Sequence, residues 1–454
     1  MASKFELKLL RMDAAKTSLP SVDEFDVIGE PVFTRPSFVS TINSLQVQYS
    51  KREEGLISAR IAVDVATGWE GALVVMGDGT AWGWDSVFYD GAVRQGSDIT
   101  TQMARIGKTA GLTTFEKCDA FGDNYVLIEQ SGRNISLGYC HYGMVANGTH
   151  SGYCDCSTPA PGCAIYWPGV APWYSYDWDD PLYGLESNSW LHFGVGGWSW
   201  NGIKSDGRLY GGGYNAYGML GIGTGDQTCK YPLATLCDTD VTGWALCEVG
   251  QITGVGIDTN GQLWIWGLED GSGSLGLGDP DLYHYQGSPT QIGTATNWID
   301  AEVSEYNGAA LNSSGELWAW GSGYRGSMAH LPGTLGCDDS GSYWCEHWFP
   351  VKISGDHFFI AFSQGWYHTL AIDEDNNVWA CGMDDTGCLG LGNELEDDYY
   401  SWQQIPNLKA SYVDAGYSTS IAIALDGSVW AWGALGNYDL YSPTQLKFGN
   451  YWED

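Results

Sequence analysis

One short pattern recurs along this chain: a tight turn, usually with glycine at its second position, followed by an aromatic run that ends in glycine. Five clear copies occupy residues 206–213, 260–267, 314–321, 375–382 and 426–433. Two weaker copies lie upstream, at 78–84 and 131–138. The turn therefore falls at positions 79, 132, 207, 261, 315, 376 and 427, which are 51 to 75 residues apart. A period of this size is typical of a repeat architecture, in which each repeat is one supersecondary unit.

Each copy has the composition of a β-hairpin with a tapered sheet. An apolar strand of small residues, such as residues 421–425, precedes the turn, and the Trp-rich strand follows it. Gly and Asn adopt positive φ at low cost, so they favour this turn. Three copies continue with Gly-x-Leu-Gly-x-Gly, at 218–223, 273–278 and 387–392. Small residues in one strand and bulky residues in the next suit wedge-shaped sheets arranged around an axis.

The motifs within residues 368–392 resemble the regulator of chromosome condensation repeat: HTLAI, a turn, VWACG, and then GCLGLG. The resemblance extends over residues of about 60 to 454 and is clearest after residue 200. It implies a seven-bladed β-propeller. We therefore predict an all-β fold with a seven-bladed β-propeller in residues 61–454 and an extended N-terminal arm in residues 1–60. A propeller fold does not itself specify a function.

Charge is unevenly distributed between the arm and the repeats. The chain has 20 Lys and Arg against 55 Asp and Glu, a formal net charge of −35. Residues 1–60 contain eight basic and eight acidic residues, which leaves 12 basic and 47 acidic residues for the propeller. Binding to a phosphate backbone requires Lys and Arg to displace counterions. We therefore expect no nucleic-acid partner. No run of 18 apolar residues occurs, so we also expect no membrane insertion.

The N-terminal arm lacks the repeat but carries apolar residues, among them Phe25, Val27, Ile28, Phe33 and Phe38. Two interpretations stay open: a strand that helps to close the ring, or an anchor to a larger assembly. Residues 29–36 and 44–52 resemble openings of tailed-phage virion proteins. On that resemblance we predict a virion component, located on the virion or extracellularly, whose arm contacts other virion proteins.

Extra residues follow the Trp-rich strand at about 139–187, 222–240, 279–288, 322–349 and 393–402. The same position in every repeat means the same face of the ring, which we predict to be the binding face. Its ligand is expected to be a host-surface glycan or protein, because aromatic rings beside carboxylates suit both. The same rings would also serve to pack long loops onto the blades, and the sequence leaves this open. The candidate binding residues are Trp173, Tyr176, Trp178, Tyr283, Tyr285, Tyr399, Tyr400 and Trp402.

Eight of the 12 cysteines lie in or beside these inserts. Cysteine pairs in long polar loops are typical of disulfides, so we predict the bridges Cys229–Cys237 and Cys337–Cys345. The pairing within the longest insert is undetermined, and zinc is an alternative there; its cysteines are Cys140, Cys154, Cys156 and Cys163. The remaining cysteines are predicted to be buried thiols in strands or turns: Cys118, Cys247, Cys381 and Cys388.

Motifs of enzymes are missing from the sequence. Residues 107–109 resemble the end of a phosphate-binding loop, but Gln102 occupies the position of its first glycine. His368 fits a core histidine better than a catalyst. We predict a non-enzymatic interaction protein without catalytic residues, metal or cofactor. The alternative to the virion component is a soluble protein-binding propeller, either inhibitor-like or, as the family resemblance implies, guanine-nucleotide exchange factor-like.

Overall fold

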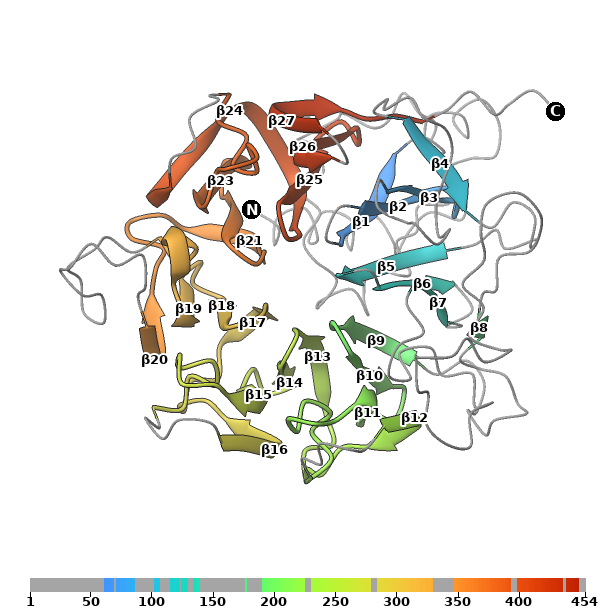
Figure 1. The fold of residues 1–454 in the computed structure, drawn as a ribbon, viewed down its shortest axis with the longest axis vertical. Helices are drawn as coiled ribbons and strands as arrows, with labels where there is room; N and C mark the ends of the chain where they lie inside the picture. The colour runs from blue at the N-terminus through green and yellow to red at the C-terminus, as the bar shows by residue number, and fades with distance from the viewer. Residues whose placement is uncertain are drawn as a thin grey trace, which may run out of the picture.

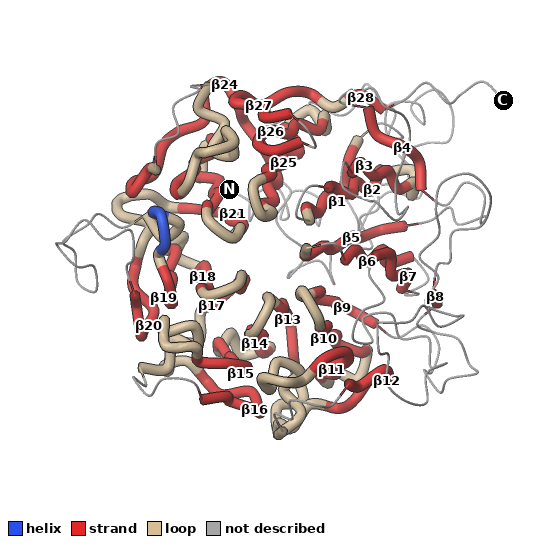
Figure 2. Tube along the Cα trace, viewed as in Figure 1, coloured by secondary structure: helices blue, strands red, loops and turns tan. Residues whose placement is uncertain are grey.

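The computed structural model describes residues 61–68, 71–85, 102–106, 115–122, 124–129, 134–138, 176–177, 190–224, 230–278, 284–329, 346–392, 398–435 and 438–448. Within these residues the structure is strands and loops, with one short helical turn, η6 (Tyr324–Gly326) (Figure 2). The strands form sheets placed side by side around a central axis, so the molecule is a ring (Figure 1). The predicted all-β propeller is confirmed. The described residues contain no helix with the length and apolar character needed to cross a membrane.

Each sheet begins with an innermost strand at the axis, and successive strands pair antiparallel toward the outside. Units 1 to 3 comprise β1 (Ala62–Thr67), β2 (Gly71–Met76), β3 (Ala81–Asp85) and β4 (Gln102–Ile106); β5 (Phe115–Phe121), β6 (Asn124–Glu129), β7 (Asn134–Gly138) and β8 (Tyr176–Asp177); and β9 (Trp190–Val195), β10 (Ser199–Lys204), β11 (Leu209–Tyr214) and β12 (Lys230–Leu236).

The later units follow the same order. Units 4 and 5 comprise β13 (Trp244–Val249), β14 (Thr253–Asp258), β15 (Leu263–Glu269) and β16 (His284–Gln291); and β17 (Trp298–Val303), β18 (Asn307–Asn312), β19 (Leu317–Ser322) and β20 (Glu346–Lys352). Units 6 and 7 comprise β21 (Phe359–Gln364), β22 (His368–Asp373), β23 (Asn377–Gly382), β24 (Tyr399–Ala415), β25 (Thr419–Ala424), β26 (Val429–Leu435) and β27 (Tyr438–Gln445). A last strand, β28 (Lys447–Phe448), lies beside β4.

The strand β24 is shared by the last two units. Its first half pairs with β23 and its second half pairs with β25, so seven strands are joined in one sheet. With β24 counted in both, the described strands divide into seven units of four, plus β28. This division matches the copies of the sequence pattern, one unit for each turn.

The two ends of the described chain meet and close the ring. The backbone N–H of Ala62 donates to the carbonyl of Gly427 at 3.2 Å, and β28 pairs in parallel with β4. Residues of β1 and β2 share an apolar cluster with residues of β24, β25 and β26, including Val65, Val74 and Ile421. Closure among the described residues therefore uses the C-terminal strands. The predicted arm, residues 1–60, lies outside the described residues, so its role stays a prediction.

The turns of the repeat have the geometry expected from their residues. Gly207, Gly261, Gly315 and Gly427 have φ between 76° and 80°, and Asn376 takes the same place with φ 64°. An Asp or Asn just before the turn accepts backbone N–H groups from inside it. At Asp258, for example, one carboxylate oxygen accepts from the N–H groups of Asn260 and Gln262, each at 2.9 Å. These local hydrogen bonds fix the register of each hairpin.

The second tryptophan of the aromatic strand holds neighbouring units together. The indole N–H groups of Trp266, Trp320 and Trp432 donate to carbonyls in the Gly-x-Leu-Gly loop of the preceding unit, at 2.9, 3.1 and 2.8 Å. All three side chains are fully buried. Glycine is needed beside them, because a Cβ at Gly276 would lie 2.7 Å from the Trp320 ring. The repeated Trp and the repeated glycine loop are thus two halves of one contact.

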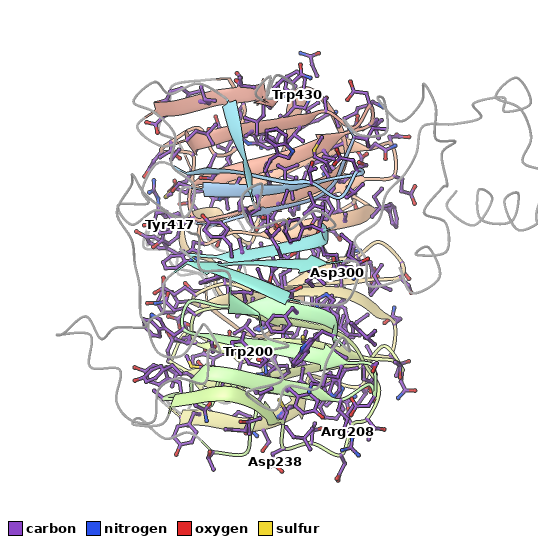
Figure 3. The ribbon with its side chains drawn as sticks, turned by 90° about the vertical axis from the view of Figure 1, so that its right-hand side faces the viewer. Trp200, Arg208, Asp238, Asp300, Tyr417 and Trp430 are labelled. Atoms are coloured by element: carbon purple, nitrogen blue, oxygen red, sulfur yellow. The ribbon has the colours of Figure 1, made fainter. Side chains whose placement is uncertain are left out.

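The ring has two faces with different kinds of connections. In every unit the first turn and the long connection after the third strand emerge on one face, because two antiparallel strands, the second and the third, lie between them. The Asp-Gly turns emerge on the other. Seen edge-on, Tyr417 of a first turn and Arg208 of an Asp-Gly turn lie toward opposite faces (Figure 3). The inserts predicted from the sequence thus begin on a single face, which we call the loop face.

Candidate binding face

Acidic side chains on the innermost strands link several units to their neighbours around the axis. A backbone N–H of one innermost strand donates to a carboxylate of the preceding one at four junctions: Cys118 to Asp64 at 2.9 Å, Val195 to Asp119 at 2.8 Å, Gln364 to Glu302 at 2.7 Å and Thr67 to Asp414 at 2.7 Å. At a fifth junction the N–H of Ala415 donates to the Ser363 hydroxyl at 3.0 Å. These carboxylates accept otherwise buried amides, which a charged acceptor does strongly.

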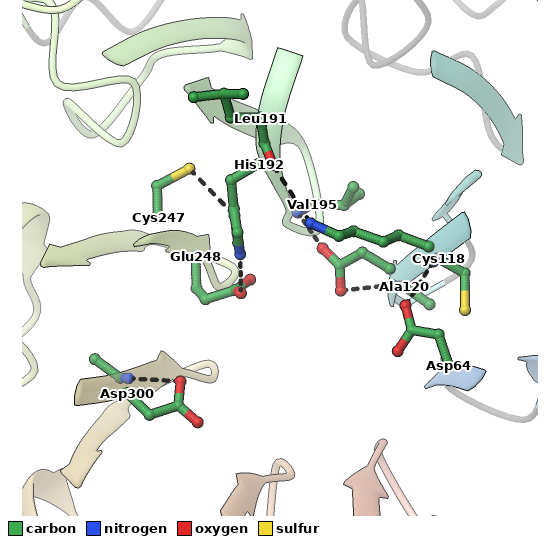
Figure 4. Close-up of polar contacts among 12 residues, drawn as sticks. Asp64, Cys118, Ala120, Leu191, His192, Val195, Cys247, Glu248 and Asp300 are labelled. Atoms are coloured by element: carbon green, nitrogen blue, oxygen red, sulfur yellow. Dashed lines mark hydrogen bonds and ion pairs between the residues drawn. The ribbon is translucent and has the colours of Figure 1, made fainter. Parts of the chain in front are cut away.

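Units 3 and 4 meet through a histidine instead. His192 Nε2 lies 3.8 Å from a carboxylate oxygen of Glu248, and the Cys247 sulfur lies 3.9 Å from His192 Nδ1 (Figure 4). Cys247 is fully buried, and burial strongly raises the pKa of its thiol, to which the Glu248 charge adds. The thiol therefore stays protonated at neutral pH. This cysteine is part of the packing, as the sequence predicted.

The innermost strands and their carboxylates form the wall around the axis, and the contacts of this wall hold neighbouring units together. Its carboxylates come from different units and are engaged between strands. In the part of the chain that the structure describes, no three His, Cys, Asp or Glu side chains are grouped as ligands of a metal ion. A cavity of about 50 Å³ lies on the axis, lined by residues of all the units, including Asp119, Glu248, Glu302 and Asp414. It is large enough for a few waters rather than an organic substrate.

Aromatic rings narrow the axis on the loop face. The rings of Phe121 in unit 2 and Trp366 in unit 6 approach across the axis, with centroids 6.1 Å apart. Both residues also line the axial cavity. The axial cavity is therefore bounded on this side by aromatic carbon rather than by an open polar mouth.

Rings in contact with one another extend outward from this point: Trp366, Tyr417, Tyr367 and Tyr324. Together with Tyr306, which interacts electrostatically with Tyr367, we call them the aromatic rim. The Trp366 and Tyr417 centroids are 4.9 Å apart, those of Tyr417 and Tyr367 5.3 Å, and those of Tyr367 and Tyr324 5.7 Å. Tyr306, Trp366, Tyr367 and Tyr417 all follow the end of an innermost strand, in the first turn of units 5, 6 and 7. Tyr306 is 37% exposed and the others are half-buried.

The rim lies beside an ion-paired loop. Arg325, in η6, has φ 54° and makes a two-point contact with Asp385, each nitrogen 2.5 Å from an oxygen. Its Nε donates to Asp398 at 3.0 Å, and Nη2 also lies 2.8 Å from an Asp398 oxygen. Since Arg325 belongs to the long connection of unit 5 and both aspartates to that of unit 6, the pair of loops is held together. The planar guanidinium of arginine can contact both carboxylates in this way, whereas the single ammonium group of lysine cannot.

The structure places the predicted binding residues in different surroundings. Tyr285 is 51% exposed at the start of β16, and Tyr399 and Tyr400 are half-buried in β24. The Trp402 indole N–H donates to the Ile353 carbonyl at 2.8 Å, and its ring packs on Phe359. Tyr176 belongs to β8, and three residues lie outside the described residues: Trp173, Trp178 and Tyr283. The role of these eight residues in binding stays a prediction.

The aromatic rim was not predicted from the sequence, because the insert lengths indicated the long connections as the binding surface instead. A signal was present. An aromatic residue follows the Gly or Ser that ends an innermost strand in several repeats, at Trp198, Tyr306, Trp366 and Tyr417. Such a position lies on the loop face close to the axis in each unit. Large aromatic residues repeated at this position are a stronger indication of a surface than the length of an insert.

One predicted disulfide is not formed in this structure. Cys237 is a free, buried thiol whose sulfur donates to the Leu220 carbonyl at 3.1 Å. Its side chain faces the inside of unit 3, near Asn201, rather than the insert. Cys229, Cys337 and Cys345 lie outside the described residues, so the second bridge stays a prediction, and so does the longest insert with its four cysteines. Cys118, Cys247, Cys381 and Cys388 are buried free thiols, as predicted.

Family models of the regulator of chromosome condensation (RCC1) repeat match residues 314–372 and 359–388. The chain carries RCC1 repeats. The matched residues belong to units 5 and 6, where the pattern of turn, Trp strand and glycine loop is clearest. The structure extends the same arrangement to the other units.

Curated relatives of the RCC1 type come from eukaryotes. The chain is 27% identical over 199 residues to the ultraviolet-B receptor UVR8 of Arabidopsis thaliana, covering 43% of this chain and 42% of the receptor. It is 26% identical over 275 residues to the mitochondrial RCC1 domain-containing protein RUG3 of the same plant, covering 58% of each. The regulator of chromosome condensation of Xenopus laevis is 35% identical over 105 residues, covering 21% of this chain and 24% of that protein. The chain thus spans about half the length of the first two relatives.

Solved RCC1-type propellers share the fold. Prp20p of Saccharomyces cerevisiae has a TM-score of 0.60 at 16% identity, covering 78% of this chain and 80% of Prp20p. Human WBSCR16 has a TM-score of 0.58 at 14% identity, covering 78% and 84%. At this identity the likeness concerns the fold alone.

These comparisons correct the predicted location. A virion or extracellular location is wrong, because the relatives are eukaryotic RCC1-like proteins and one is mitochondrial. The prediction depended on the resemblance of residues 29–36 and 44–52 to virion proteins, and these residues lie outside the described residues. The soluble protein-binding alternative fits the comparisons better than the virion component.

Proposed function

We propose that this chain is a non-enzymatic propeller that binds a partner protein through its loop face. The observation that carries the proposal is the aromatic rim. It joins rings of units 5, 6 and 7 in one surface, and Phe121 of unit 2 meets it across the axis. Aromatic side chains are enriched in protein interfaces because they provide large contact areas with few rotatable bonds.

The rigidity of the loops beside the rim supports the same proposal. Arg325 joins the connections of units 5 and 6 through two carboxylates, and its side chain is only 21% exposed. A surface held in place before binding loses less conformational freedom when the partner arrives. The loop face therefore has both contact groups and preorganisation.

The partners of related propellers agree with a protein ligand. Prp20p is described as binding Gsp1p and histones, and it has been solved bound to Kap60. Those partners belong to Prp20p. For this chain the comparison supports only a class of function, namely the binding of another protein by one face of the ring.

Site-specific photo-crosslinking tests the proposal. A photoreactive amino acid replaces Tyr417 on the loop face or Arg208 on the opposite face (Figure 3), and each protein is irradiated in an extract of its source cells. We expect one protein to be crosslinked from position 417 and not from position 208. That protein, once purified, should bind the unmodified propeller and bind a Tyr417→Ser variant more weakly. Equal crosslinking from both faces, or none from position 417, contradicts the proposal.

A further inference from the structure

Carboxylates surround the most exposed ring of the aromatic rim. We call Asp270, Glu305, Tyr306 and Glu346 the rim patch. Glu305 is the neighbour of Tyr306 in the first turn of unit 5, and its carboxylate interacts with the Tyr306 side chain. The long connection of unit 4 reaches the same turn, since the Ser272 hydroxyl lies 3.4 Å from the Tyr306 carbonyl. The Asp270 carboxylate is held there by the N–H of Ser272 at 3.0 Å.

The charges in the rim patch are of one sign. Burial raises the pKa of Glu305, and the negative charge of Asp270 raises it further. Burial also raises the pKa of Glu346, and Asp270 and Glu269 add to that effect. The nearby Arg325 is already engaged by Asp385 and Asp398. A cation brought by a partner would therefore relieve repulsion among these carboxylates.

The rings provide the second half of a binding surface for a cation. Tyr306 is 37% exposed, and the half-buried Tyr367 and Tyr417 continue the surface toward the axis. An arginine guanidinium stacks on aromatic faces and pairs with a carboxylate through two parallel hydrogen bonds. A lysine ammonium makes the first contact less well and cannot make the second. Rings and carboxylates side by side thus favour arginine over lysine.

We infer that the rim patch binds an arginine-bearing basic segment of the partner protein. The inference depends on the proposed function, since it names the chemistry of the partner at the loop face. The guanidinium lies against the Tyr306 ring and pairs with Glu305, with Asp270 and Glu346 supplying the surrounding negative charge. Acidic repeats with 47 acidic against 12 basic residues favour the approach of such a segment over an acidic one.

Peptide titration tests this inference on the full chain. The probe is a capped hexapeptide of alternating glycine and arginine, and calorimetry measures its dissociation constant. Peptides with lysine or glutamate in place of arginine are the comparisons. We expect the arginine peptide to bind best, the glutamate peptide not to bind, and the affinity to fall as salt rises. The double variant Glu305→Gln with Tyr306→Ser should bind the arginine peptide at least about tenfold more weakly.

A matched control removes one exposed ring and one exposed carboxylate elsewhere: Phe358→Ser with Asp240→Asn. Phe358 is 54% exposed and precedes Phe359, whose N–H donates at 2.9 Å to the Gly315 carbonyl in the hairpin turn of unit 5, on the face opposite the rim. The affinity of this control variant for the arginine peptide should stay within about twofold of the affinity of the unaltered protein. Equal weakening in control and rim variants, or unchanged binding in the rim variant, overturns the inference. If position 417 still crosslinks a partner in that case, the proposed function stands and only the basic segment is wrong.

Discussion

Asp414 connects residues from opposite ends of the described chain. Its carboxylate accepts both the N–H of Thr67, at 2.7 Å, and the hydroxyl of the same residue, at 2.5 Å. The two residues are 347 positions apart in sequence and both are buried. A single acceptor therefore satisfies two buried donors where the ring closes. Loss of the acceptor would leave both donors without this partner.

We predict that Asp414→Ala lowers the free energy of unfolding by about 2–3 kcal/mol, because buried donors left unsatisfied cost about 1–3 kcal/mol. Urea denaturation followed by circular dichroism measures the change. The control is Asp439→Ala, which removes the same charge from an exposed position of β27 and should cost less than about 0.5 kcal/mol. Similar losses for the two variants would contradict the closing role of Asp414.

His368 makes stability depend on pH. It is fully buried, its Nε2 lies 2.9 Å from the Ser420 hydroxyl, and burial lowers its pKa from 6.5 to about 4. As the pH falls, the histidine therefore binds a proton at a higher pH in the unfolded chain than in the folded chain. The contribution of neutral His368 to the free energy of unfolding is fully present above pH 6.5 and is lost as pH falls toward 4. The difference in pKa corresponds to about 3 kcal/mol.

The variant His368→Gln separates this effect from acid titration of the carboxylates. We expect the unaltered protein to lose more stability than the variant between pH 7.5 and pH 4.5, by roughly 2–3 kcal/mol. Urea midpoints at the two pH values give the comparison. A loss of equal size in both proteins would show that His368 does not titrate as its burial requires.

At the scale of the strand, the two tryptophans of one β-strand have different tasks. In β19, Trp320 is fully buried and donates to the Ser274 carbonyl of the preceding unit at 3.1 Å. Trp318 is half-buried and contacts Trp298 of its own unit, with ring centroids 6.3 Å apart. The first therefore holds neighbouring units together, whereas the second covers the sheet it belongs to.

We predict that Trp320→Phe destabilises the protein by about 2–3 kcal/mol, through a cavity and a carbonyl left without its donor. The same change at Trp318 should cost less than about 1 kcal/mol, because its ring is only half-buried. Thermal and urea unfolding of both variants test the difference. Equal losses of stability in the two variants would mean that the repeated tryptophan does not stabilise the ring through its contact with the glycine loop.

Local chemistry explains which parts of this fold were predictable. Turns with Gly207 or Asn376, and strands ending in Trp-x-x-Gly, repeat the same backbone requirement, so the propeller follows from them. The inter-unit hydrogen bonds of Asp119 and Asp414 were not predicted, because they join residues far apart in sequence with no fixed spacing. Cys237 was paired by its distance from Cys229, whereas its burial depends on how β12 meets Asn201. The aromatic rim needed the closed ring to bring its rings together.

At the scale of the whole molecule, the ring depends on its last strands. Removing residues 447–454 deletes β28, which pairs in parallel with β4 through Lys447 and Phe448. We predict that amide hydrogen exchange then becomes faster in β4 and remains slow in β15, which lies in unit 4. Exchange measured by mass spectrometry on both proteins reports the change. Unaltered protection of β4 would mean that β28 is not needed to close the ring.

Because Thr67 donates to Asp414, this contact of the first unit cannot form until the ribosome has made the seventh unit. At the usual rate of synthesis, about 5–20 residues per second, the delay between these two residues is roughly 17–70 s. During that interval the apolar side of unit 1 that belongs against unit 7, including Val65 and Val74, has no covering surface. The order of synthesis therefore makes the earliest part of this ring the part that waits longest for its neighbour.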